Sequence, residues 1–352
     1  MRTVGAGTIT QALIDTQKDA SRTPYIDITI NGTNYWSRLE YLEYHEEAYR
    51  ERATIGLNNR DRALDGLDLD GKEFSIKLGY DTSAHGGSTT DTVTYPTMWV
   101  KSHQIVSAMG QRYYQIYAEG MWMMLREKKI DIGVDGDQDD IYSNTFNRTH
   151  TIEALIKLVI GAMGWTWTAV TSANTDGIIN NTNHNPLFEI NRVPFENAAA
   201  ILYRLIWMTK GYLRAKPNTT FEFVYPQGSD TVDETYYSDQ ANWFTEYVEK
   251  TILLVPNSII VLANQDPDTL EWNTPGYPLV VGTAKDNAQI AKYTEVIEVF
   301  LVGSITSKAA ADARAEAILS KLQSETLGGR LVAPHDCQVE PYDKVLILDS
   351  RL

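Results

Sequence analysis

Short runs of alternating apolar and polar residues, separated by turn signals, constrain this fold more than any other feature of the sequence. In the segment YIDITI, Ile26, Ile28 and Ile30 alternate with polar residues, and a period of two places them on one face of a strand. Asn31 and Gly32 follow directly, and both tolerate the positive φ that a two-residue hairpin turn needs. The sequence therefore predicts an antiparallel hairpin as the first β element of the chain.

The same alternation continues to about residue 126. Three apolar residues share one strand face in each of two further segments, RATIGLN and KEFSIKLGY: Ala53, Ile55 and Leu57, then Phe74, Ile76 and Leu78. WVKSHQIV and RYYQIYAEGMWMML extend the series as strands, with no convincing helix between them. Many short strands of this kind are typical of an antiparallel barrel or sandwich. We expect an N-terminal arm over residues 1–24 and a first β-barrel-like domain over 25–130.

After an acidic linker over residues 131–149, the apolar period changes to that of a helix. The segment TIEALIKLVIGAMG carries one apolar stripe, Ile152, Leu155, Ile156, Val159, Ile160 and Met163. Thr151 is a suitable N-cap, and a second helix follows Pro194 in FENAAAILYRLIWMTKG. Strand patterns in GYLRAK and TTFEFVY come next, so residues 150–235 read as a small α+β domain.

Residues 236–352 return to β patterns in YVEKTILLV, NSIIVLAN, PLVVGTA and YTEVIEVFLV. We expect one helix within them, capped by Ser307. The alanines of this helix form a thin apolar stripe that permits close packing. The apolar run Val345–Leu348 favours a strand buried on both faces. The predicted fold is thus mainly β within the α+β class, with two antiparallel barrel-like domains flanking the helix-containing one.

A weak internal echo links the two β parts. RATIGLN followed by DGKEFSIKLG is similar in pattern to NSIIVLAN followed by YDKVLILDS. Either one barrel was duplicated, or unrelated strands share a common hydrophobic pattern.

Charge and cysteine content exclude some functions. The chain has 31 Lys and Arg against 46 Asp and Glu, a formal charge of −15, which opposes binding to phosphate backbones. Its only cysteine, Cys337, cannot form an internal disulfide, which fits assembly in the cytosol. No stretch approaches the roughly 20 apolar residues of a membrane-spanning helix, so we expect no membrane anchor.

An acidic stretch within the linker is the first candidate site. It contains five aspartates, Asp131, Asp135, Asp137, Asp139 and Asp140. A calcium loop is a poor match, because Gly133 stands at a ligand position and Tyr142 replaces the bidentate Glu. Two interpretations remain: a solvated linker, or a loop that keeps a channel wall negative so that DNA slides past without binding.

Catalytic and cofactor motifs are not evident. The six histidines show no close metal-ligand pairing, and no GxSxG, Walker or GxGxxG motif is present. Acidic neighbours such as Glu46–Glu47 do not show the two acids across a cleft that glycoside hydrolysis requires. We therefore expect no catalytic residue, no cofactor and no metal. A peptidoglycan hydrolase and a carbohydrate-binding β module, with tryptophans as sugar platforms, remain the alternatives.

In the order of its segments, nearly the whole chain resembles the hub proteins of phage tail tips. This group includes the baseplate hub of contractile tails, the late-control-protein family and the tail-associated hubs of non-contractile tails. The resemblance is carried by RATIGLNNRD, LDGKEFSIKLGYD, TIEALIKLVIGAMGWTW, VPFENAAAILYRLIWMTKGYLR, VPNSIIVLAN and ARAEAILSKL before APHDCQVEPYDKVLILDSR.

The resemblance implies a structural protein of the virion tail tip, assembled in the host cytoplasm. Three copies would form a ring whose six similar barrels match the sixfold tail tube. Its partners would be a tail tube or distal tail protein and a spike, fibre or other tip protein, with the tape-measure protein as a further candidate. DNA would pass without specific binding. It also implies that Tyr342 and Asp343 form the turn before a late barrel strand, with the Asp side chain accepting bonds from nearby backbone N–H groups.

The sequence departs from this group at its end. Related barrels carry further strands after the segment that resembles YDKVLILDSR, whereas this sequence stops at Leu352. Either the chain is cut short or a neighbouring molecule completes the sheet.

Overall fold

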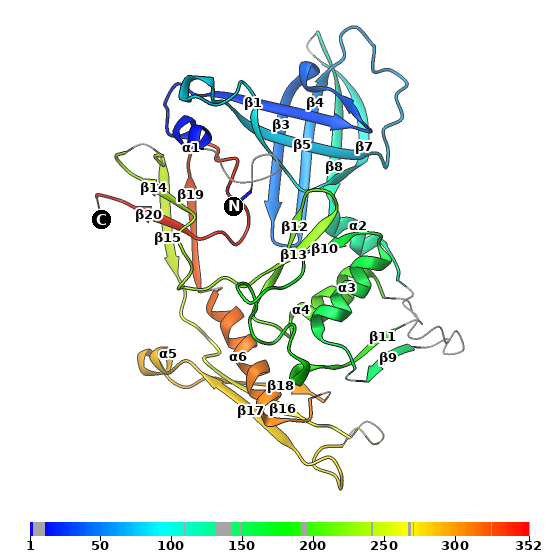
Figure 1. Cartoon of the computed structure of the whole chain (residues 1–352), viewed down its shortest axis with the longest axis vertical. Coiled ribbons are helices and arrows are strands. Elements are labelled where there is room, and N and C mark those ends of the chain that lie inside the picture. Colours follow the sequence, from blue (N-terminus) through cyan, green and yellow to red (C-terminus); the bar gives the residue numbers. More distant parts are fainter. Residues whose placement is uncertain are drawn as a thin grey trace.

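A computed structural model describes residues 1–2, 11–108, 110–130, 143–147, 149–191, 196–240, 242–266, 269, 271–303, 305–324 and 326–351. The fold is mainly β with a few helices, and most of its strand pairs are antiparallel (Figure 1). This confirms the predicted fold class. The sheets are open, without a closed barrel among the described residues.

The first part of the chain forms one eight-stranded antiparallel sheet, in the order β2-β1-β5-β7-β8-β4-β3 with β6 paired to β5. Its strands are β1 (Thr23–Ile30), β2 (Thr33–Asn34), β3 (Leu39–Glu47), β4 (Arg50–Asn58), β5 (Glu73–Asp81), β6 (Asp91–Thr94), β7 (Met98–Ala108) and β8 (Gln111–Gly120). In Figure 1, β1 and β5 cross in front of β3 and β4, so the sheet folds over its own core.

The predicted hairpin and inward faces are confirmed in this sheet. Asn31 and Gly32 have φ of 49° and 75° and join β1 to β2. The inward residues of β4 and β5 are all buried: Ala53, Ile55, Leu57, Phe74, Ile76 and Leu78. Within residues 1–24, a short helix α1 (Gln11–Gln17), which the sequence did not predict, buries Leu13 against the same core. Two 3₁₀ turns, η1 (Trp36–Arg38) and η2 (Ser83–His85), complete this part.

One predicted strand is wrong. The segment RYYQIYAEGMWMML is a strand only as far as Gly120, and α2 (Met121–Glu127) follows it. Met121, Trp122 and Leu125 are buried on one helical face, at a spacing that a strand would split between its two sides. Because nearly every residue of GMWMML is apolar, the sequence does not show the change from the period of a strand to that of a helix.

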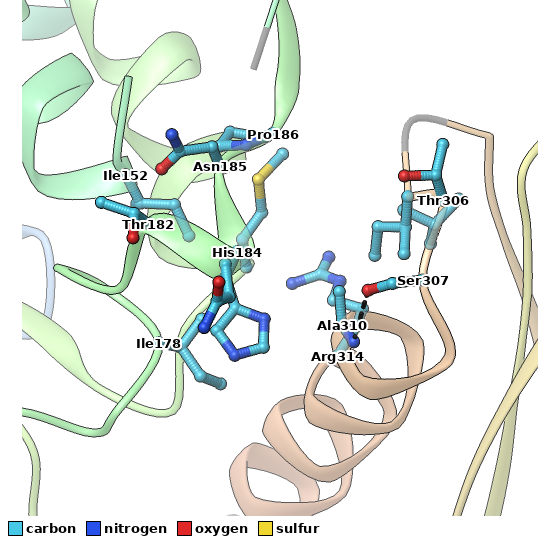
Figure 2. Close-up of a pocket in the computed structure, with 14 residues that line it drawn as sticks. Ile152, Ile178, Thr182, His184, Asn185, Pro186, Thr306, Ser307, Ala310 and Arg314 are labelled. Atoms are coloured by element: carbon cyan, nitrogen blue, oxygen red, sulfur yellow. Dashed lines mark hydrogen bonds between the residues drawn. The ribbon is translucent and has the colours of Figure 1, made fainter. Parts of the chain in front are cut away.

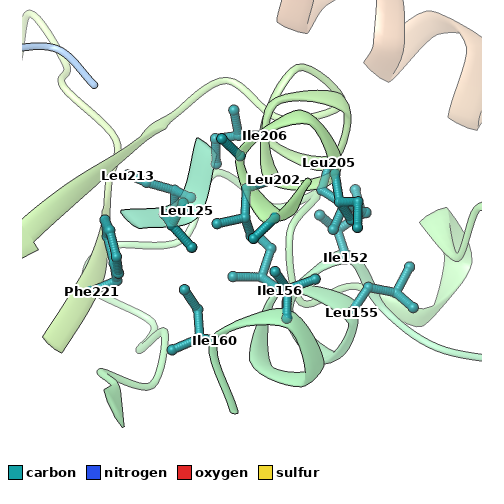
Figure 3. Packing of buried hydrophobic residues seen from close by; sticks show 14 of the residues in the cluster. Leu125, Ile152, Leu155, Ile156, Ile160, Leu202, Leu205, Ile206, Leu213 and Phe221 are labelled. Carbon is teal, nitrogen blue, oxygen red and sulfur yellow. The ribbon is translucent and has the colours of Figure 1, made fainter. Parts of the chain in front are cut away.

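The middle part packs two helices, α3 (Ile152–Ala162) and α4 (Ala198–Ile206), against a small sheet in the order β10-β13-β12. Its strands are β10 (Thr166–Trp167), β12 (Tyr212–Lys216) and β13 (Thr220–Val224), with β9 (Ser143–Asn147) and β11 (Leu187–Asn191) paired separately and η3 (Thr182–His184) between them. Figure 3 shows side chains of both helices meeting Leu213 and Phe221 in one apolar core. Thr151 caps α3 by accepting from Ala154 N at 3.2 Å, as predicted.

The last part of the chain forms three small sheets. The pairs β14–β20 and β15–β19 are two-stranded, and the third sheet has the order β17-β16-β18. The elements are β14 (Glu234–Tyr237), β15 (Glu246–Thr251), β16 (Ser258–Ala263), β17 (Val280–Lys285), α5 (Asn287–Lys292), β18 (Ile297–Val302), α6 (Lys308–Ser324), β19 (Leu327–Val332) and β20 (Val345–Leu348). The pairs β14–β20 and β16–β18 are parallel, so this part does not repeat the strand pairing of the first sheet.

The number of helices in this last part differs from the expectation. It contains two helices rather than one, because Asp286 caps the additional short helix α5 by accepting from Gln289 N at 3.0 Å. In Figure 1, the pairs β14–β20 and β15–β19 lie together below α1. The strands β16, β17 and β18 lie apart from them, beside α6.

Candidate assembly surface

Exposed apolar side chains are concentrated in the last third of the chain. Fourteen of the twenty exposed large hydrophobic residues among those described lie after residue 236: Trp243, Val248, Ile252, Leu253, Val255, Leu279, Val281, Tyr293, Ile297, Val299, Leu301, Val345, Leu346 and Leu348. Single exposed apolar residues are normal, whereas a contiguous exposed apolar patch is typical of an interaction site. The fourteen residues fall into separate regions, because the pairs β14–β20 and β15–β19 lie apart from the sheet β17-β16-β18 (Figure 1). We call the three exposed apolar residues of β18, Ile297, Val299 and Leu301, the assembly surface.

Among the described residues, one face of the sheet β17-β16-β18 is covered and the other is exposed. Helix α6 packs on the inner face, where Ile259, Val261 and Ala263 of β16 are fully buried. The outer side of the edge strand β18 presents Ile297, Val299 and Leu301, which are 51%, 50% and 66% exposed. An apolar sheet face beside an unpaired strand edge favours pairing with a strand of another chain.

The strand β20 was expected to be buried on both faces, and this is wrong. Val345, Leu346 and Leu348 are 39%, 41% and 44% exposed, although Tyr236 of the partner strand β14 is buried. Among the described residues β20 pairs with β14 alone, in parallel register. The apolar run nevertheless has the composition of a fully enclosed strand.

A cluster of buried charges connects the segment before β20 to the middle domain. Tyr342, with φ of 74°, and Asp343 lie in and directly after the turn that precedes β20. Asp343 Oδ2 accepts from Glu340 N at 3.0 Å, and its Oδ1 lies 2.9 Å from Arg214 Nη1. Lys216 Nζ lies 2.9 Å from Glu340 Oε1. Burial opposes ionisation of Glu340, but the neighbouring cations Arg214 and Lys216 lower its pKa overall.

The N-terminal residues reach the same cluster. The Met1 amino group lies 3.0 Å from Asp343 Oδ1, and Arg2 pairs with Glu46 of β3 and lies over the Tyr95 ring at 4.0 Å. The first sheet, the middle domain and the chain before β20 are therefore joined by one ionic network. Sequence reasoning singled out Asp343 and missed its cationic partners, which come from a strand more than a hundred residues earlier.

The other sequence candidates form no site in the part of the chain that the structure describes. The aspartates Asp131, Asp135, Asp137, Asp139 and Asp140 lie outside the described residues. Cys337 is buried, and burial raises the pKa of its thiol to about 12, which disfavours a thiolate nucleophile. In the part of the chain that the structure describes, no three His, Cys, Asp or Glu side chains are grouped to hold a metal ion. Nor does any described helix have the length and apolar character to cross a membrane.

Comparisons with known proteins identify similar structures but no sequence family. No protein-family model and no curated protein matches the sequence. A tail protein from Neisseria meningitidis MC58 superposes with a TM-score of 0.60 at 13% identity, covering 94% of this chain and 87% of that one. The 43 kDa tail protein of prophage MuSo2 from Shewanella oneidensis gives 0.61 at 11% identity, covering 94% and 90%. The chain therefore shares the overall fold of these two tail proteins.

Proposed function

We propose that this protein is a structural hub of a phage-type tail tip. Three copies form a ring that joins a sixfold tail tube or distal tail protein to a threefold spike, fibre or other tip protein. The tape-measure protein is a further candidate partner. The protein is assembled in the host cytoplasm, becomes part of the virion tail and needs no catalytic residue. The shared fold with two tail proteins supports this proposal.

The observation that carries the proposal is the assembly surface. A protein that acts alone does not gain from leaving Val299 and Leu301 half or more exposed beside an open strand edge. Burying such residues against a second chain would supply the apolar centre that stable interfaces have. In the ring, the strands β14, β15, β19 and β20 would form the second barrel-like module, completed by strands from outside the described chain.

The acidic composition supports the second part of the proposal, a channel for DNA. A formal charge of −15 disfavours retention of a phosphate backbone, so DNA would pass through a ring of three copies without specific binding. The aspartates between Asp131 and Asp140 would contribute to the negative wall.

Solution mass tests the hub directly. Light scattering should give three times the 39.6 kDa of one chain, alone or with tube protein, and electron microscopy should show a ring. Leu301→Asp should return the protein to monomers, because it places a charge in the interface. The same substitution at an exposed position should change the free energy of unfolding of the monomer by no more than about 0.5 kcal/mol. Ile105→Asp, at a residue 43% exposed on the first sheet, is the matched control and should leave the ring intact.

A wild-type protein that stays monomeric with tube protein present would refute the proposal. An unchanged assembly in Leu301→Asp, with the same behaviour in the Ile105→Asp control, would refute the part of it that places the β18 face in the interface.

A further inference from the structure

A cavity lies where the middle domain meets the start of α6. It has a volume of about 160 Å³ and is lined on one side by Ile178, His184 and Pro186 and on the other by Ser307 and Arg314 (Figure 2). This volume accommodates several water molecules or one small ligand. The cavity is separate from the assembly surface and from the cluster around Glu340.

Arg314 is a partly exposed residue whose guanidinium group is largely buried and has no counter-charge among the described residues. Its Nε and Nη1 atoms are inaccessible to solvent and make no hydrogen bond. Burial alone lowers the pKa of Arg314 to about 10, so the guanidinium group stays charged at neutral pH. A buried charge without a partner is costly, and buried guanidinium groups are normally paired with carboxylates or phosphates. Figure 2 shows the guanidinium group pointing into the cavity toward His184.

One neighbouring group, Lys321, adds a partial positive charge to this region, because its pKa lies near neutral. Lys321, two turns further along α6, is 3% exposed and donates to Ile206 O at 2.5 Å. Burial and the charge of Arg314 lower the pKa of Lys321 to about 7, against the opposing effect of Asp176. The basic residues Arg314 and Lys321 thus lie one above the other on one face of α6, and no acid among the described residues offsets the charge of Arg314.

The helix start adds a second attraction for an anion. Helix α6 has 17 residues and no acidic side chain in its first turn. Ser307 caps it by accepting from Ala310 N at 3.2 Å, and both residues line the cavity. Backbone N–H groups at a helix start and the positive end of the helix dipole favour an anion at this place. On the opposite wall, burial lowers the pKa of His184, so its ring is neutral and can share a hydrogen bond with an oxygen.

We propose that this cavity is an oxyanion site, in which the guanidinium group of Arg314 and the first turn of α6 bind one carboxylate or phosphate group. The bound group would contact both walls, and it would thereby link the middle domain to the unit of α6 and β16–β18. The chemistry common to both ligand types is a compact group of negatively charged oxygens that accepts hydrogen bonds from N–H donors.

Isothermal titration calorimetry of the full chain tests this site with two probes, inorganic phosphate and acetate, each against sodium chloride at equal ionic strength. Wild-type protein should bind at least one of them at one site per chain, and the tighter probe identifies the ligand class. Arg314→Leu should weaken binding by about tenfold or more, and Arg314→Lys should retain part of it. Arg330→Leu, which changes an exposed arginine that pairs with Glu246 at 3.7 Å, is the control and should bind like wild type.

A folding defect would not obscure the result. Arg314→Leu removes an uncompensated buried charge, so without ligand it should melt at or above the temperature of the wild type. Binding that is equal for phosphate, acetate and chloride would overturn the proposal, and so would undiminished phosphate or acetate binding in a folded Arg314→Leu protein.

Discussion

At the scale of single residues, Glu51 and Glu340 show how the surroundings decide the state of a buried carboxyl group. Both side chains are at most 5% exposed. Glu340 lies among Arg214 and Lys216, which lower its pKa against the effect of burial. Glu51 has no nearby cation of that strength and its Oε2 makes no hydrogen bond, so burial and then the charge of Glu46 raise its pKa to about 8.

The substitution Glu51→Gln should therefore stabilise the protein at high pH. A carboxyl group whose pKa is raised from 4.5 to about 8 contributes stability that is present below about pH 4.5 and lost as the pH rises through 8. The amide cannot ionise, so the variant should gain roughly 3–5 kcal/mol in free energy of unfolding over the wild type between about pH 5 and pH 9. Urea unfolding at a series of pH values measures this difference.

Glu340→Gln is the matched control with the opposite sign. The pKa of Glu340 is lowered, so its stabilising effect is present above about pH 4.5 and fades as the pH falls. This variant should have a lower free energy of unfolding than the wild type at pH 7, and the difference should shrink as the pH falls. A Glu51→Gln difference that does not change with pH would show that Glu51 is ionised in the folded protein across this range, as it is in the unfolded chain, and that its pKa is not raised.

At the scale of elements, the packing of α6 on its sheet depends on small residues on both sides. The alanines Ala311 and Ala315 are fully buried. Gly282 of β17 faces them so closely that a Cβ at this position would lie 2.2 Å from the Ala311 carbonyl carbon and 2.6 Å from Asp312 N. The contact is with the helix backbone, which cannot rotate aside as a flexible side chain can.

The substitution Gly282→Ala should destabilise this unit by about 1–3 kcal/mol, because α6 has to move away from the sheet. Chemical unfolding measures the loss, and hydrogen exchange should locate it in α6 and β17. Gly161→Ala in α3 is the control: a Cβ there meets nothing within 4 Å, so the change should stabilise by up to about 1 kcal/mol. Equal effects of the two substitutions would disprove the close helix–sheet contact.

The elements that sequence reasoning predicted correctly are those with a local cause. The turn at Asn31 and Gly32, the cap at Thr151 and the alanine stripe of α6 follow from backbone preferences and spacing within a few residues. Some errors are local, such as the helices α1, α2 and α5, and others concern what lies above or beside an element. The apolar run Val345–Leu348 carries no information on whether its covering layer belongs to the same chain.

The candidate sites show the same limit. Ionic partners such as Arg214 and Asp343 are far apart in sequence, and no local pattern links them. Arg314 and Lys321 did carry a signal, because a spacing of seven places them on one face of a helix that is rich in alanine. Basic residues on the buried face of a predicted helix deserve the same notice as acidic clusters.

At the scale of the whole molecule, assembly has to overcome like charge. Each copy carries a formal charge of −15, so three copies repel one another over distances set by the ionic strength. The screening length falls from about 30 Å at 0.01 M salt to about 10 Å at 0.1 M. The attraction proposed for the assembly surface is apolar, through residues such as Val299 and Leu301, and salt does not weaken it.

Assembly should therefore tighten as salt is added. Sedimentation at a fixed protein concentration should show a rising trimer fraction between about 10 mM and about 300 mM sodium chloride, where repulsion is progressively screened. Leu301→Asp should remain monomeric throughout, since screening cannot replace the lost apolar contact. Dissociation of the wild type by salt would mean that ion pairs hold the copies together, and the exposed face of β18 would then need another explanation.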